Sequence, residues 1–132
     1  MIPKIGTTDG ALIIADFYQR SMPWAKFITV AYPRFHDVYE QAGVDHSWGP
    51  IDDANGLTYR QTLDKALSAN GQVVQIATWN DWGEGTLIEP SQEFGYRDLE
   101  YTLRALRSVR HTHSTVMPTD LRIPKRIYDL RK

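Results

Sequence analysis

The chain has 132 residues, 42% of them hydrophobic, with 15 basic and 16 acidic side chains and a net charge of −1. This length allows one domain with a real core, and the nearly balanced charge argues against a nucleic-acid or anionic-membrane partner. The absence of cysteine excludes disulfides and thiolate metal sites and leaves the cellular compartment open. The first ten residues contain no long apolar run, so no signal peptide or membrane span is expected there.

The first elements expected are a helix and a strand. Asp9 is predicted to cap a helix that runs to about Arg20, with apolar side chains recurring on one face, and Pro23 closes it. Residues 26–32 are β-branched and aromatic, which predicts a strand. The polar and aromatic residues that follow this strand, from Arg34 onward, are interpreted as a functional loop.

A long irregular connection is expected over residues 38–56, and a loop of that length in a compact domain is usually functional or mobile. Trp48 within it has two interpretations: it lines a sugar subsite, or it is a buried anchor that pins the loop. The acidic stretch 52–56 lacks the spacing and the closing Glu of a calcium loop, so it is interpreted as a turn.

A second helix, a second strand and a third helix complete the pattern. Thr58 and Gln61 form a capping-box pattern at the start of the second helix, and Asn70-Gly71 is predicted to end it. Residues 73–78 predict the second strand. The third helix is expected from about Tyr96, where apolar residues recur at helical spacing.

The richest chemistry follows the second strand. Asp81 and Glu84 are three residues apart with Gly83 between them, so a tight turn brings both carboxylates to one side of a shared pocket. Two such carboxylates suit acid/base work on a glycosidic bond. Trp79 and Trp82 supply flat apolar faces that match the C–H faces of sugar rings. The alternative is a loop whose tryptophans pack in the core and whose acids are solvated.

The run Trp-Asn-Asp-Trp-Gly-Glu-Gly-Thr at 79–86, with Ile-Glu-Pro at 88–90, resembles the signature of glycoside hydrolase families 99 and 71 and of bacterial WbsX-like proteins. Family 99 carries Trp-Asn-Glu-Trp-His-Glu-Gly-Thr-x-Ile-Glu, and family 71 carries Trp-Asn-Asp-Tyr-Gly-Glu. The resemblance implies that Asp81 and Glu84 are the catalytic pair. Asp81 and Gly83 depart from family 99, so the resemblance does not carry over the mechanism of either family.

The expected fold is α/β, the C-terminal part of a (β/α)₈ TIM barrel, with two parallel strands and about three helices. A full barrel needs about 250 residues, so the barrel is incomplete. The remainder of a longer chain, or further copies in a homo-oligomer, is expected to complete it. Residues 1–116 are predicted to form the partial barrel with the catalytic loop, and residues 117–132 a tail that packs on the surface.

The functional hypothesis is a glycoside hydrolase that cleaves α-linked polysaccharide such as α-mannan or α-1,3-glucan, without a metal or cofactor. Glu84 is assigned as general acid and Asp81 as base or stabiliser. The further substrate-binding candidates are aromatic and polar residues on the same loop or after the first strand: Trp79, Asn80, Trp82, Glu89, Arg34, Asp37 and Trp48. Activity of the chain alone is uncertain, because the barrel is incomplete.

Two other functions stay open. One is a non-catalytic carbohydrate-binding remnant, which predicts oligosaccharide binding without turnover. The other is a glycosyltransferase of polysaccharide biosynthesis, although the sequence has no glycine-rich phosphate loop and no Asp-x-Asp motif. His111 and His113 are interpreted as helix-end residues and not as metal ligands, because no third ligand is evident.

Overall fold

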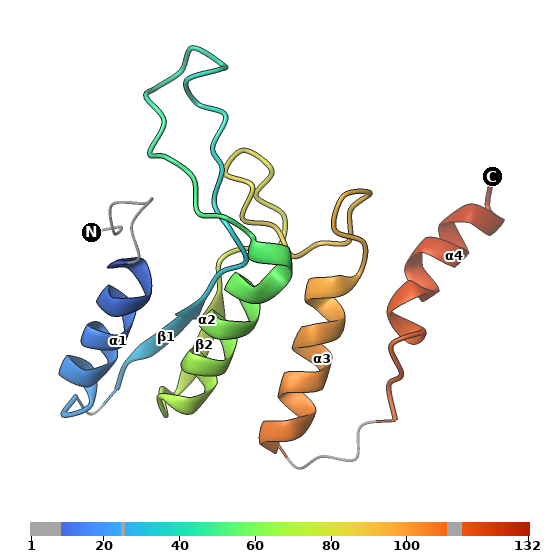
Figure 1. Cartoon of the computed structure of the whole chain (residues 1–132). Coiled ribbons are helices and arrows are strands. Elements are labelled where there is room, and N and C mark those ends of the chain that lie inside the picture. The colour runs from blue at the N-terminus through green and yellow to red at the C-terminus, as the bar shows by residue number, and fades with distance from the viewer. Residues whose placement is uncertain (1–8, 25, 111–114) are drawn as a thin grey trace. The chain divides into compact units, whose positions relative to one another are not determined.

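The computed structural model describes residues 9–24, 26–110 and 115–132. The helices and strands follow in the order α1 (Asp9–Ser21), β1 (Ile28–Ala31), α2 (Leu57–Ser68), β2 (Val73–Ile76), α3 (Arg97–Arg110) and α4 (Ile123–Leu130) (Figure 1). Short 3₁₀ helices cover Ala54–Gly56 and Asp120–Arg122. The chain divides into two compact units, Met1–Ile88 and Glu89–Lys132.

The first unit is built on a two-stranded parallel sheet. Ile28 pairs with Val73 and Ala31 with Ile76, so the two strands are in register along their length. The connection between them contains α2, as a parallel pair requires. The sequence-based strands, 26–32 and 73–78, are each longer than the observed strands and include all of their residues.

Helix α2 provides the core of this unit. Tyr59, Leu63 and Ala66 are buried on one face of the helix, and α2 packs against β1. The predicted capping box is wrong. The N-cap residue is Gly56 in the left-handed conformation, and the Thr58 hydroxyl donates to the carbonyl of Asp52 at 2.6 Å.

The outer edge of β1 is partly closed by a side chain. The carbonyl of Ala31 accepts from the amide of Ala77, so the backbone groups of the preceding residue, Val30, face away from β2. There the Tyr18 hydroxyl donates to the Val30 carbonyl at 2.9 Å and accepts from its amide at 3.0 Å. Burial raises the pKa of Tyr18, which keeps the phenol protonated as a donor.

We expect Tyr18→Phe to lower the free energy of unfolding by about 1–3 kcal/mol, because both Val30 groups lose their partner. Urea denaturation measures the change. Tyr32→Phe is the matched control, since the Tyr32 hydroxyl has no hydrogen-bond partner in the described part of the chain, and it should shift the value by about 0.5 kcal/mol or less. Equal losses in the two variants would contradict a stabilising role for the Tyr18 hydroxyl.

The second unit holds α3 and α4. The guanidinium of Arg122 joins them: it donates to Glu100 at 2.6 Å and to the carbonyl of Pro118 at 2.8 Å, and it lies 4.6 Å from the centre of the Tyr96 ring. Helix α4 is a fourth helix that the sequence analysis did not predict. The division at residue 116 and the packing of the tail on the surface stay predictions.

The structure confirms the predicted fold class, two parallel strands with helices in an incomplete α/β barrel. Each of the three predicted helices is present within a few residues of its expected bounds. Within the described ranges, no helix combines the length and the apolar character needed to cross a bilayer.

Candidate functional site

Two loops leave the sheet at its carboxyl end, where α/β proteins place their ligand sites. One follows β1 and leads into the long connection to α2, and the other follows β2 and carries the two predicted acids. Figure 1 shows both extending from the same end of the strands. We call residues 78–88 the acid loop and residues 35–39 the facing segment.

The acid loop is closed at its base by two threonines. The amide of Thr78 donates to the carbonyl of Thr86 at 2.9 Å, and their hydroxyls share a hydrogen bond of 3.0 Å. The amide of Ile88 donates to the carbonyl of Thr78 at 3.1 Å. Thr86, Leu87 and Ile88 are buried, so the loop has a fixed base in the core of the first unit.

Both predicted catalytic acids lie in the turn of this loop. The amide of Asp81 donates to the Thr78 hydroxyl at 3.0 Å, and the Asp81 Oδ1 atom accepts from the amide of Glu84 at 3.0 Å. Neither carboxylate forms an ion pair with a described residue. Asp81 Oδ2 and Glu84 Oε2 have no hydrogen-bond partner in the described ranges, so one oxygen of each acid is available for a ligand.

The facing segment runs along the acid loop and is bonded to it through the backbone. The amide of His36 donates to the carbonyl of Glu84 at 2.8 Å, and the amide of Val38 donates to the carbonyl of Gly83 at 3.0 Å. Gly85 permits this approach: its φ is +65°, and an added Cβ would lie 3.1 Å from the His36 carbonyl oxygen.

We expect Gly85→Ala to separate the two loops, because the methyl group strains the backbone and also crowds His36. The expected cost is about 1–3 kcal/mol, with faster hydrogen exchange at the amide of His36. Gly43→Ala is a matched control: its φ of +66° is nearly the same, but an added Cβ would meet nothing within 4 Å. If both variants lose the same stability, backbone strain alone explains the effect and the close approach is unimportant.

Tyr39, a residue that the sequence analysis did not select, reaches one of the acids. Its hydroxyl donates to Glu84 Oε1 at 3.0 Å. This hydrogen bond raises the pKa of Tyr39, and partial burial and the charges of Glu84, Asp81 and Asp37 raise it further. The Tyr39 side chain therefore links the facing segment directly to Glu84.

Two of the predicted substrate-binding residues are buried. The Arg34 side chain is 6% exposed and donates to the Leu87 carbonyl at 2.7 Å and to Asp53 at 3.3 Å. Asp37 is 3% exposed and accepts from the amide of Trp48 at 2.8 Å. In this structure they hold loops in place, and the predicted contacts with sugar stay predictions.

The predicted aromatic residues are open to solvent. Trp79, Trp82 and Trp48 are 49%, 57% and 55% exposed, so each presents ring surface that a sugar can reach. Trp48 is anchored only through its backbone amide, which donates to Asp37. Its ring is not buried, and the ring centre lies 4.5 Å from that of His46.

The last two candidates are polar. Asn80 is exposed, and its carbonyl accepts from the amide of Trp82 at 3.1 Å. Glu89 is the first residue of the second unit. The roles predicted for both in binding sugar hydroxyls stay predictions.

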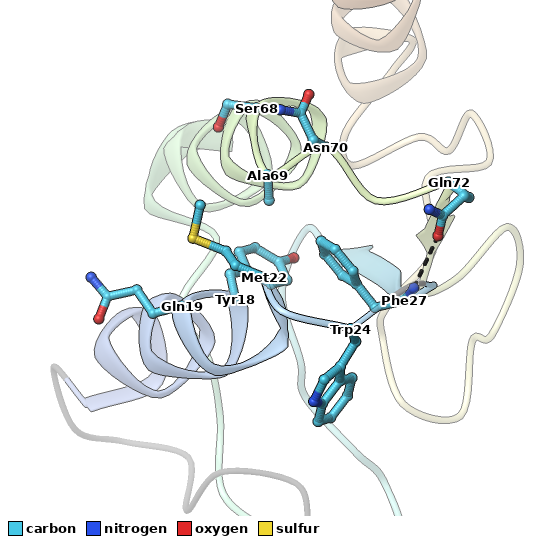
Figure 2. A pocket seen from close by; sticks show the side chains of 9 residues that line it. All are labelled: Tyr18, Gln19, Met22, Trp24, Phe27, Ser68, Ala69, Asn70 and Gln72. Carbon is cyan, nitrogen blue, oxygen red and sulfur yellow. Dashed lines mark hydrogen bonds between the residues drawn. The ribbon is translucent and has the colours of Figure 1, made fainter.

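A separate hollow of about 350 Å³ lies at the other end of the strands (Figure 2). Its walls come from the end of α1, the end of α2 and the residues that lead into the two strands. The amide of Phe27 donates to Gln72 there at 3.0 Å. The hollow contains none of the predicted site residues, and it lies away from the acid loop.

Among the described residues, no three His, Asp or Glu side chains come together as a metal site would require. Residues 52–56 form a turn as predicted: Asp53 accepts from the amide of Gly56 at 3.1 Å. His111 and His113 lie outside the described residues.

The fold of the chain is similar to part of the α/β barrel of glycoside hydrolase family 99 structures. The structure of the family 99 endo-α-mannosidase from Bacteroides thetaiotaomicron matches with a TM-score of 0.58 and 24% identity over 85% of this chain. The same enzyme in complex with bis-tris-propane matches with a TM-score of 0.56 and 22% identity, also over 85% of the chain. This chain spans 37% and 41% of those two structures.

The sequence itself is similar to a second group. A family model described as glycosyltransferase WbsX matches residues 51–102, which include the acid loop. No curated protein matches the chain. The resemblance to WbsX-like and family 99 proteins is therefore confirmed, by sequence for the first group and by fold for the second.

Proposed function

We propose that this chain carries the acid/base site of a glycoside hydrolase that acts on α-linked polysaccharide. The observation that carries the proposal is the geometry of the acid loop: two carboxylates free of ion pairs with described residues, each with an oxygen available, with Asp81 bonded to the amide of Glu84 and Glu84 bonded to the hydroxyl of Tyr39. The fold shared with a family 99 endo-α-mannosidase supports the reaction class, and α-mannan is therefore the first substrate to test.

In the proposed reaction, Glu84 gives a proton to the glycosidic oxygen while Asp81 assists attack at the anomeric carbon. The resemblance to family 99 implies attack through the 2-hydroxyl of the sugar, and the resemblance to family 71 implies direct inversion by water. The exposed rings of Trp79 and Trp82 beside the acids suit the apolar faces of pyranose rings. A carboxyl separation of roughly 6.5–9.5 Å would leave room for a water, and about 5 Å would not.

The test is an assay of α-mannan and α-1,3-glucan with this chain and with the longer protein that contains it, if the gene extends further. Reducing ends should appear with one of the two polymers, and NMR of the first product formed gives the anomeric outcome. Oligosaccharide binding without turnover in both proteins would favour a non-catalytic remnant instead.

A glycosyltransferase is the second candidate, because the family model that matches residues 51–102 carries that description. This function requires a place for a nucleotide diphosphate. Titration with nucleotide sugars, followed by calorimetry, separates the two candidates: saturable binding that depends on the diphosphate would favour transfer, and binding of oligosaccharide alone would favour hydrolysis.

A further inference from the structure

The hydrogen bond from the Tyr39 hydroxyl to Glu84 is supported by backbone hydrogen bonds between the facing segment and the acid loop. The backbone hydrogen bonds from His36 to Glu84 and from Val38 to Gly83, at 2.8 and 3.0 Å, keep the facing segment against the acid loop. Tyr39 follows directly, and its hydroxyl lies 3.0 Å from Glu84 Oε1. The backbone next to Tyr39 and the hydroxyl of Tyr39 are therefore both bonded to the acid loop, which fixes the position of this side chain.

The charges around Tyr39 determine the direction of this hydrogen bond. Three carboxylates, Asp37, Asp81 and Glu84, act on the phenol and disfavour its ionised form. The phenol thus stays protonated through neutral pH, so Tyr39 donates and Glu84 Oε1 accepts. The second oxygen, Oε2, has no partner in the described ranges and is the one left to carry a proton.

We infer that Tyr39 is a positioning residue for the general acid, which fixes Oε2 of Glu84 as the oxygen that delivers the proton. The inference rests on the proposed hydrolase function. In the step, the proton moves from Oε2 to the glycosidic oxygen, and the bond from that oxygen to the anomeric carbon breaks with its electron pair going to the leaving oxygen. The attacking oxygen, assisted by Asp81, forms the new bond to the anomeric carbon. Glu84 becomes a carboxylate, and Tyr39 keeps its proton and donates a stronger hydrogen bond to the charged acceptor.

Tyr39→Phe keeps the ring and removes only this donor. We expect kcat to fall about tenfold with KM nearly unchanged, because the bond gains strength only as Glu84 loses its proton. Tyr32→Phe is the control and should change neither kcat nor KM. A fall in kcat matched by a similar change in KM, or an equal fall in Tyr32→Phe, would indicate a merely structural role and overturn the inference.

A second measurement does not depend on turnover. Tyrosine-labelled NMR titration follows Tyr39 directly, and Glu84→Gln should lower its pKa toward the ordinary value by removing the charge on its hydrogen-bond partner. Asp81→Asn should lower it less, because Asp81 acts only through its charge. No response to Glu84→Gln would overturn the inference even if the chain hydrolyses polysaccharide. Conversely, a normal response without any hydrolysis would overturn the proposed function and still support the Tyr39–Glu84 contact.

Discussion

Glu84→Gln should lower kcat for the cleaved polysaccharide by about 10²–10⁴-fold, because an amide cannot give the leaving oxygen its proton. The fold should be unaffected, because both backbone hydrogen bonds of residue 84 are kept. Its amide still donates to Asp81, and its carbonyl still accepts from the amide of His36. Circular dichroism and the melting temperature check this. Glu40→Gln, at an exposed position near the facing segment, is the matched control and should retain full activity.

A substrate with a better leaving group separates the roles of the two acids. A glycosyl fluoride needs little protonation of its leaving group, so it should restore much of the activity of Glu84→Gln. It should not restore Asp81→Asn, because attack at the anomeric carbon still lacks its base. If both variants hydrolyse α-mannan and α-1,3-glucan at near-normal rates, the acid loop is not the catalytic centre.

Arg34→Met should lower the free energy of unfolding of the chain by about 3–5 kcal/mol, the range for removing one partner of a buried ion pair. Its guanidinium joins the Leu87 carbonyl, at the buried end of the acid loop, to Asp53 in the connection before α2. Methionine fills much of the volume of the arginine side chain. It leaves the Leu87 carbonyl without the guanidinium donor and Asp53 without the positive charge of Arg34.

The control for Arg34 is Arg20→Met. Arg20 is also paired with an aspartate, Asp16, but its side chain is 72% exposed. Solvent screens such a pair, and the loss should stay within about 1 kcal/mol. Urea denaturation of both variants gives the comparison. Similar small losses at the two positions would mean that Arg34 does not hold the acid loop, and its predicted role in binding substrate would then be the better assignment.

The sequence predicted the elements of the first unit well, because their signals are local. Apolar periodicity identifies α1 and α2 there, as it identifies α3 in the second unit, and the β-branched runs identify the strands. Helix α4 was missed for a physical reason. Pro124 occupies the first turn, where a helix needs no amide donor, so it does not break the helix.

The acid pair was also visible in the sequence, since the spacing of Asp81 and Glu84 in a tryptophan-rich turn is local information. Tyr39 was not, because its role depends on two loops that are far apart in the sequence and meet through backbone hydrogen bonds. Arg34 was predicted to bind substrate, and that role stays a prediction, because in the structure its buried guanidinium bonds to Leu87 and Asp53. A guanidinium that holds a loop differs from one that binds a ligand in its burial. Burial depends on the whole fold, so the local sequence does not reveal it.

The bond between Tyr18 and Val30 has a consequence for association between chains. A foreign strand that approaches the outer edge of β1 meets backbone groups already engaged by a phenol, and must expel it before the ladder can extend. Tyr18→Phe should therefore also increase self-association at high concentration, because the Val30 backbone groups are then free to pair with a strand of another chain.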